Sequence, residues 1–418
     1  MTSHSLDGLI TAISTRLADP EHVAGPQPGW AQQLAYGAPG IALLHIELAA
    51  REMAPWQRAH DWLAAAGSAA LTCGPDSHPY YGAPTMAHAL ACAADRLPGA
   101  YRNALANLDR HLAADVRRRL AAGGDRLDGG RLPALAEFDA IRGLTGYGAY
   151  LLHRNPDGDL LRAVLKYLVR LTEPITTEAG TVPGWWTKSG PSGRADDRFP
   201  DGHSNHGVAH GIGGPLALLA LAARRGITVP GHLGAIRTIC AWLDRWSIDT
   251  GRGTTWPYWV TDLRGGIPPQ TGPLRPSWCY GAAGLCRAQQ LASMALGDTD
   301  RQVLAENALI SALTDPAQLA ATNDSGLCHG YAGLAHVAAR AADDALPTTA
   351  GQLRALIPAL LHVIHPPGTD AEKAAVALAL APEGPGLLDG AAGIALAVLA
   401  PSSTVPPSTA WDSCLLIA

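Results

Sequence analysis

No apolar stretch of this sequence is long enough to span a membrane, because glycine, proline or a charged residue interrupts each one. The first twenty residues also lack the basic start and apolar core of a secretory signal peptide. Seven cysteines, an odd number, argue against a complete disulfide framework. Together these absences predict a cytoplasmic protein whose cysteines are reduced.

Positive charge is scarce and scattered. Lys and Arg number 31 against 36 Asp and Glu, which gives a net charge of −5. The one tight basic run, residues 117–119, falls on a helical pattern and is interpreted as a solvated face. Without a basic stripe, nucleic acid is not an expected partner. The 418 residues are 47% hydrophobic, which is enough for a large core.

A short glycine element of the form G-x-x-G recurs seven times along the chain. Its first glycines are Gly37, Gly82, Gly143, Gly211, Gly281, Gly330 and Gly390. The second copy has Thr85 in place of its last glycine, for which we expect only a local change in packing. An apolar stretch rich in Ala and Leu follows each element, and amphipathic segments such as 232–246 lie between them. Each repeat therefore predicts an outer amphipathic helix followed by a buried inner helix.

Seven buried helices, each backed by an outer one, pack best as a closed ring. The sequence thus predicts an all-α fold, an α/α toroid of about seven inner and seven outer helices, in one domain over residues 1–418. An open solenoid is the alternative, but its terminal repeats should be polar. The seventh repeat is as apolar as the others, which favours closure.

Two connections, residues 180–205 and 250–277, are long and look irregular. Loops of this length in a compact fold are usually functional or disordered. Both lead directly into a G-x-x-G element, so we expect them at the end of the ring that holds the site. Their tryptophans could line a peptide groove or pack the loops down.

Two cysteines occupy the same position in two copies of the repeat. Cys279 and Cys328 each lie two residues before a first glycine, and His329 follows the second cysteine. Since a repeat places equivalent positions at equivalent ends of neighbouring units, these groups should converge. Two thiolates and an imidazole suit zinc and leave a fourth position open for chemistry. The alternatives are two small buried residues or a disulfide; a structural zinc is disfavoured because C-x-x-C pairs are absent.

The residues just before each first glycine are further candidates for the rim of a site. They are Tyr36, Tyr81, Arg142, His210, Tyr280, His329 and Asp389. His210 shares the register of His329 and is a candidate acid or base. Asp139 could orient an imidazole or cap a helix. Arg275, four residues before Cys279, could stabilise an oxyanion or form a surface salt bridge.

Three motifs, taken in order, resemble the lanthionine synthetase C-like proteins. They are Ala-His-Gly-Ile-Gly-Gly-Pro at 209–215, Trp-Cys-Tyr-Gly at 278–281 and Cys-His-Gly at 328–330. The resemblance spans nearly the whole chain through the seven glycine elements. Some family members carry a small extra domain between early repeats, but residues 94–138 are expected to be mainly helical and leave little room for one.

The resemblance implies one Zn²⁺ in an α/α toroid, held by Cys279, Cys328 and His329. It also implies site roles for four further residues. The acid/base histidine falls on His210 and the aspartate on Asp139, while the arginine and tyrosine that flank the first zinc cysteine fall on Arg275 and Tyr280.

Family members of the cyclase type, the lantibiotic or lanthipeptide cyclases, close thioether rings in a ribosomally made peptide that is already dehydrated. Zinc would present the substrate cysteine as thiolate, which adds to dehydroalanine or dehydrobutyrine. His210 or Arg275 could stabilise the enolate, and His210 could protonate it. The implied partners are a dehydrated precursor peptide with its leader, a separate dehydratase and a transporter, because no kinase-like or lyase-like segment is seen before the toroid.

Two other functions compete with the cyclase. A lanthionine synthetase C-like enzyme could instead add glutathione or another small thiol to dehydrated residues. A catalytically silent toroid could scaffold a peptide-modifying complex, although a pure scaffold would not need the Cys and His set. Toroidal glycosidases and zinc prenyltransferases are disfavoured because paired thiols match neither kind of site.

Overall fold

The computed structural model describes residues 3–23, 29–178, 180–190, 193–194, 196–263, 274–402 and 406–418. The chain forms two compact units. The first contains Met1–Leu112, Thr322–Ala342 and Gly351–Trp411, and the second contains Ala113–Ala321, Asp343–Ala350 and Asp412–Ala418. A single domain over the whole chain stays a prediction, and each unit is described below by itself.

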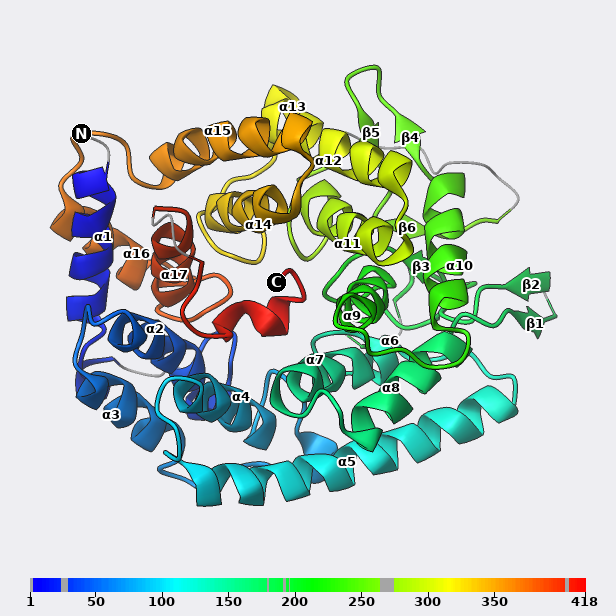
Figure 1. Ribbon diagram of the computed structural model, residues 1–418, viewed down its shortest axis with the longest axis horizontal. Coiled ribbons are helices and arrows are strands. Elements are labelled where there is room, and N and C mark those ends of the chain that lie inside the picture. Colours follow the sequence, from blue (N-terminus) through cyan, green and yellow to red (C-terminus); the bar gives the residue numbers. More distant parts are fainter. Residues whose placement is uncertain are drawn as a thin grey trace. The chain divides into compact units, whose positions relative to one another are not determined.

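Each expected inner helix begins one or two residues after the first glycine of its G-x-x-G element. The first unit holds all or most of α2 (Ala38–Ala50), α4 (Ala83–Ala94), α14 (Tyr331–Asp344) and α17 (Ala391–Ser402), and the second holds α7 (Leu144–Arg154), α9 (Gly213–Arg224) and α11 (Ala282–Leu296) (Figure 1). Every residue of α2 before Ala50 is buried. The apolar character of these helices on all faces therefore matches the burial of an inner layer.

Outer helices cover the inner ones within each unit. The first unit contains α1 (Ser3–Arg16), α3 (Trp56–Ala66), most of α15 (Pro347–Ile364) and α16 (Ala371–Leu380), the second contains α8 (Asp159–Arg170), α10 (His232–Arg245) and α12 (Thr299–Thr314), and α5 (Arg102–Asp128) contributes to both. In α8, Leu161, Val164, Leu165 and Leu168 are buried at helical spacing while Lys166 is exposed. Helix α2 packs against α3, α4 and α17, and α9 packs against α7, α10 and α11.

The segment from residue 94 to residue 138 is mainly helical, as expected. It contains the 27-residue helix α5 and the short helix α6 (Leu135–Phe138). The remaining short helices are α13 (Pro316–Ala320) and the 3-10 turns η1 (Pro20–His22), η2 (Trp30–Gln32), η3 (Gly74–Asp76) and η4 (Trp411–Leu415). Among the helices described, none combines the length and apolar character needed to cross a bilayer.

The two long connections are less irregular than the sequence suggests, because short antiparallel strands organise them. Strand β1 (Ile175–Thr177) pairs with β2 (Gly180–Val182), β4 (Ile248–Asp249) with β5 (Thr254–Thr255), and β3 (Ser204–Asn205) with β6 (Trp259–Val260). The β3–β6 pair joins one connection to the other, with Ser204 opposite Val260. The Pro268-Pro269 pair lies outside the described residues.

Most tryptophans of these connections pack inward. Trp185, Trp186 and Trp256 are buried, and each indole N–H donates a hydrogen bond, to Ser204 Oγ, Asp201 O and Leu243 O respectively. Trp259 is only partly buried. Packing thus accounts for three of these four side chains, and the partly exposed Trp259 packs against Phe199, Tyr258 and Tyr280.

Glycine is required where the fifth element turns into α11. Gly281 has φ +131°, and a Cβ there would overlap the main-chain oxygen of Arg275. Only glycine combines this backbone conformation with such a close approach. At the degenerate second element, Thr85 is buried and its hydroxyl lies 2.8 Å from the main-chain oxygen of Gly82, so this change is accommodated locally.

Candidate functional site

An aspartate–histidine pair lies in the second unit. Asp139 follows α6, and its side chain is 1% exposed. Its Oδ1 accepts hydrogen bonds from the main-chain N–H groups of Arg142 (2.6 Å) and Gly143 (2.9 Å). Its Oδ2 lies 2.7 Å from Nδ1 of His210. Asp139 therefore both caps a turn and orients an imidazole, the two roles that the sequence left open.

The contact with Asp139 determines which nitrogen of His210 can take part in chemistry. A carboxylate only accepts, so the neutral imidazole carries its proton on Nδ1 and has a lone pair on Nε2. The His210 side chain is 19% exposed, whereas Asp139 is shielded from solvent. This arrangement can move a proton at Nε2 while the ring stays in place.

Tyr280 lies beside His210. The two rings are stacked, with centroids 6.3 Å apart and an interplanar angle of 27°. The Tyr280 hydroxyl accepts a hydrogen bond of 3.0 Å from Nδ2 of Asn205, whose Oδ1 accepts from the N–H of Gly207. Sequence reasoning missed Asn205. Its position six residues before Gly211 is the only signal that could have singled it out.

Cys279 is buried in the same unit and linked to the loop of His210, because its main-chain oxygen accepts from the N–H of Ala209 at 3.4 Å. The neighbouring Trp278 indole donates to the main-chain oxygen of Leu415 at 2.9 Å and anchors this segment. The cysteine thus lies on a firmly held stretch of backbone.

Arg275 lies at the start of this stretch and is half-buried. Its main-chain oxygen accepts a hydrogen bond of 2.8 Å from the hydroxyl of Tyr258. Burial raises the pKa of Tyr258 to about 12, so this phenol stays protonated and acts as a donor at neutral pH. The structure therefore places Asp139, His210, Tyr280, Cys279 and Arg275 in one unit.

The other two predicted zinc ligands, Cys328 and His329, lie in the first unit with two carboxylates. Nδ1 of His329 is 2.7 Å from Oδ2 of Asp324, and its Nε2 is 3.4 Å from Oδ1 of Asp389. Ligand atoms of Cys328, His329 and Asp389 all lie within 4.8 Å of one another. In the first unit, these side chains thus form a compact group of a thiol, an imidazole and carboxylates.

The chemistry of this donor set fits zinc. Sulfur, nitrogen and carboxylate oxygen are the three atom types that bind zinc in proteins. A metal-binding histidine usually donates its other ring N–H to a carboxylate, as His329 can do to Asp324. Sequence reasoning missed Asp324, which lies six residues before Gly330 as Asn205 lies before Gly211. The full set of Cys279, Cys328 and His329 combines residues of both units and stays a prediction.

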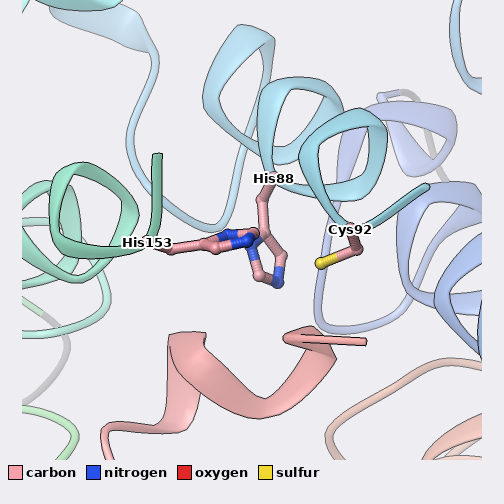
Figure 2. Close-up of side chains that lie close together, drawn as sticks. All are labelled: His88, Cys92 and His153. Carbon is pink, nitrogen blue, oxygen red and sulfur yellow. The ribbon is translucent and has the colours of Figure 1, made fainter. Parts of the chain in front are cut away.

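A second group of potential ligands involves α4. His88 and Cys92 lie one turn apart on this buried helix, and Figure 2 draws them with His153, which belongs to α7 of the second unit. Nε2 of His88 is 3.2 Å from the main-chain oxygen of Trp411. This contact gives His88 a structural role within the first unit.

Comparison with known proteins assigns the chain to a family. Residues 30–416 match the family model described as lanthionine synthetase C-like protein. The nisin biosynthesis protein NisC of Lactococcus lactis subsp. lactis is 27% identical over 244 residues, which are 57% of this chain and 56% of that protein. The solved structure of nisin cyclase matches with a TM-score of 0.73 at 20% identity, over 99% of this chain and 97% of that one. The predicted all-α toroidal fold is thereby confirmed. This chain belongs to the lanthionine synthetase C-like family.

Proposed function

We propose that this chain is a zinc-dependent peptide cyclase. It would form lanthionine and methyllanthionine by adding a cysteine thiolate to dehydroalanine or dehydrobutyrine in a ribosomally made precursor peptide. The observation that carries the proposal is the Asp139–His210 pair beside Tyr280, in the unit that also holds Cys279. Membership of the family and the fold of nisin cyclase support it.

Cys279, Cys328 and His329 would hold the zinc ion. When bound there, zinc lowers the pKa of a coordinating thiol and so supplies a thiolate nucleophile at neutral pH. Two features support this assignment: the two cysteines share a repeat position, and Asp324 holds the His329 ring through Nδ1. Cysteines that served only as small buried residues would need neither a shared repeat position nor an oriented histidine beside them.

His210 would deliver the proton that completes the ring. The sulfur forms a bond to the β-carbon, the electrons of the C=C bond move toward the carbonyl oxygen as an enolate, and the α-carbon then takes a proton. No redox change is involved. Because Asp139 occupies Nδ1, the proton would leave from Nε2 of protonated His210, and Asp139 stabilises that cation. Arg275 and Tyr280 would stabilise the enolate.

Three aromatic side chains support a peptide rather than a small thiol as the substrate. Tyr258, Trp259 and Tyr280 pack against one another with ring centroids 5.5 to 5.7 Å apart. All three are only partly buried, and Tyr280 reaches the ring of His210. An aromatic surface beside the acid suits an extended chain with side chains of its own. Competition between a dehydrated cysteine-containing peptide and glutathione would measure this preference.

Ring closure does not change the mass of the peptide, so the experiment must count thiols. A dehydrated cysteine-containing peptide is incubated with the protein and then treated with N-ethylmaleimide, which labels only cysteines outside rings. We expect the wild type to remove one label per ring, and His210→Ala to bind the peptide but leave the cysteines labelled.

His111→Ala, at an exposed position of α5, is the matched control and should behave as the wild type. Full ring closure by His210→Ala would contradict the role of His210 as the acid. Unchanged labelling with the wild-type protein would contradict the proposal that the protein is a cyclase.

A further inference from the structure

We propose that Asp389 is an additional ligand of the metal ion, through Oδ1, in the protein without its peptide. The inference rests on the proposed function in so far as a metal is bound beside Cys328 and His329. It extends that function, because the coordination position that was expected to be open would be occupied by a carboxylate of the chain itself. All the residues that carry it lie in the first unit.

The backbone brings the sixth and seventh glycine elements together. Asp389 precedes Gly390 just as His329 precedes Gly330. The N–H of Cys328 donates to the main-chain oxygen of Leu388 at 2.8 Å. A Cβ at Gly326 would lie 2.7 Å from Cα of Asp389, so only a glycine allows this approach. The position of Asp389 beside Cys328 and His329 is therefore fixed by the main chain.

The two carboxylates beside His329 stand at different distances. Oδ2 of Asp324 is 2.7 Å from Nδ1, which is a strong hydrogen bond. Oδ1 of Asp389 is 3.4 Å from Nε2, beyond the usual range for such a bond. Asp324 thus fixes the ring, and Nε2 faces Asp389 across a gap.

That gap has the size expected for two ligands of one zinc ion. Zinc lies about 2.0–2.1 Å from imidazole nitrogen and about 2.0–2.2 Å from carboxylate oxygen, and tetrahedral geometry then separates the two atoms by roughly 3.4 Å. The Nε2–Oδ1 distance is 3.4 Å, and the sulfur of Cys328 lies within 4.8 Å of a ring nitrogen of His329 and of a carboxylate oxygen of Asp389.

Burial points the same way. The Asp389 side chain is only 14% exposed, and a buried carboxylate is costly unless it is paired or binds a metal ion. Asp324 supplies the orientation of His329, so a second carboxylate is not needed for that task.

The direct test is the zinc affinity of Asp389→Asn, measured by competition with a chromogenic chelator on the full chain. We expect affinity to fall by roughly 100-fold or more, since loss of an outer-shell partner alone typically costs 10- to 100-fold. Asp370→Asn is the control, because Asp370 is an exposed N-cap of α16 in the same unit. It should bind zinc as the wild type does. Affinity of Asp389→Asn that is unchanged, or reduced by clearly less than 100-fold as for an outer-shell partner, would overturn the inference.

A second variant keeps the inference testable if Asp389→Asn folds poorly. Asp389→Cys should place a further thiolate on the metal. With Co²⁺ in place of zinc, the sulfur-to-metal charge-transfer absorption should increase relative to the wild type. An unchanged spectrum from a folded Asp389→Cys protein with bound cobalt would contradict a ligand at this position.

The outcomes separate this inference from the proposed function. Zinc-dependent ring closure by the wild type, together with unchanged zinc affinity in Asp389→Asn, would remove Asp389 from the metal site and leave the cyclase standing. Tight zinc binding that depends on Asp389, without ring closure, would support the ligand and reject the cyclase. A wild type that binds no zinc would reject both.

Discussion

Asp139 and Asp324 perform the same two tasks in different repeats. Each uses Oδ1 to accept from the main chain, Asp139 from Gly143 and Asp324 from Gly326, and Oδ2 to hold a histidine Nδ1. An asparagine at either position can keep the main-chain bond through its amide oxygen but no longer presents a carboxylate to the ring. These substitutions therefore keep the hydrogen bond that stabilises the turn and remove the carboxylate that holds the imidazole.

Asp139→Asn should slow ring closure strongly without unfolding the protein. The His210 ring would lose both its orientation and the stabilisation of its protonated form, so we expect a loss of about 10²- to 10⁴-fold in rate. Single-turnover labelling of peptide thiols measures it, with peptide affinity measured alongside. A rate close to that of the wild type would contradict the assigned role.

Asp324→Asn should weaken zinc binding by roughly 10- to 100-fold, the usual effect of losing a carboxylate that orients a metal-bound histidine. The thermal stability of the zinc-free protein should change little, because an amide oxygen can still accept from Gly326. Chelator competition and a melting curve of the same sample check both statements. Lower stability with unchanged affinity would mean that Asp324 only supports the turn.

The sequence indicates His210 through its repeat position and Asp139 through the family resemblance, but it gives no comparable signal for Asp324 or Asn205. Both lie in loops six residues before a first glycine, where Asp and Asn are common as turn residues. Whether the second oxygen or nitrogen of such a side chain reaches a histidine or a tyrosine depends on the three-dimensional path of the loop. Spacing alone does not determine that path.

At the level of elements, the glycine that opens each inner helix controls where the preceding residues lie. Gly281 follows Cys279 and Tyr280, and it has a positive φ together with a main-chain oxygen in the place of a Cβ. Any side chain there must shift the backbone that carries the cysteine. The turn and the position of Cys279, the proposed metal ligand, are therefore coupled.

Gly281→Ala should lower the free energy of unfolding by more than Gly297→Ala. Gly297, at the end of α11, also has a positive φ (+66°), but nothing lies within 4 Å of its would-be Cβ. Backbone strain alone costs on the order of 1–3 kcal/mol, and the overlap at Gly281 adds to it. Urea unfolding of both variants makes the comparison, and equal losses would contradict the steric argument.

The short strands of the two long connections could not be predicted from the sequence pattern. The length of the connections and their position before glycine elements were informative, but the strands within them are two or three residues long. So short a strand has no alternation to detect. Its pairing, as between Ser204 and Val260, depends on residues far away in the sequence.

For the whole molecule, buried neutral histidines make stability depend on pH. Burial lowers the pKa of His45, His203 and His206 to about 4 each. The neutral form of His206 is also needed as an acceptor, because its Nε2 takes a hydrogen bond from the Trp242 indole at 3.0 Å. In the unfolded chain these groups take up protons near pH 6.5.

Stability should therefore be greatest above about pH 6.5 and fall as the pH drops toward about 4, by on the order of a few kcal/mol, because the unfolded state binds more protons in that window. Urea unfolding at neutral pH and at about pH 4.5 measures the difference. His206→Gln should reduce it, whereas His111→Gln at an exposed site should not. A free energy of unfolding that rises on acidification would contradict this sign.

The repeat made the fold predictable at this scale. Seven glycine elements, each followed by an apolar stretch, were enough to predict inner helices that the structure places directly after each element. The division into two compact units was not predicted from the sequence. The repeats resemble one another, and a local sequence pattern does not show which of them make more contacts with each other. Long-range packing decides where such a boundary falls.

Ring closure should depend on a zinc ion held by Cys279, Cys328 and His329. The most direct measurement is thiol labelling of a dehydrated peptide after incubation with the zinc-stripped protein, before and after zinc is restored. We predict that every cysteine is labelled without zinc and that restoration of zinc protects one cysteine per ring. Full ring closure by the zinc-stripped protein would contradict it.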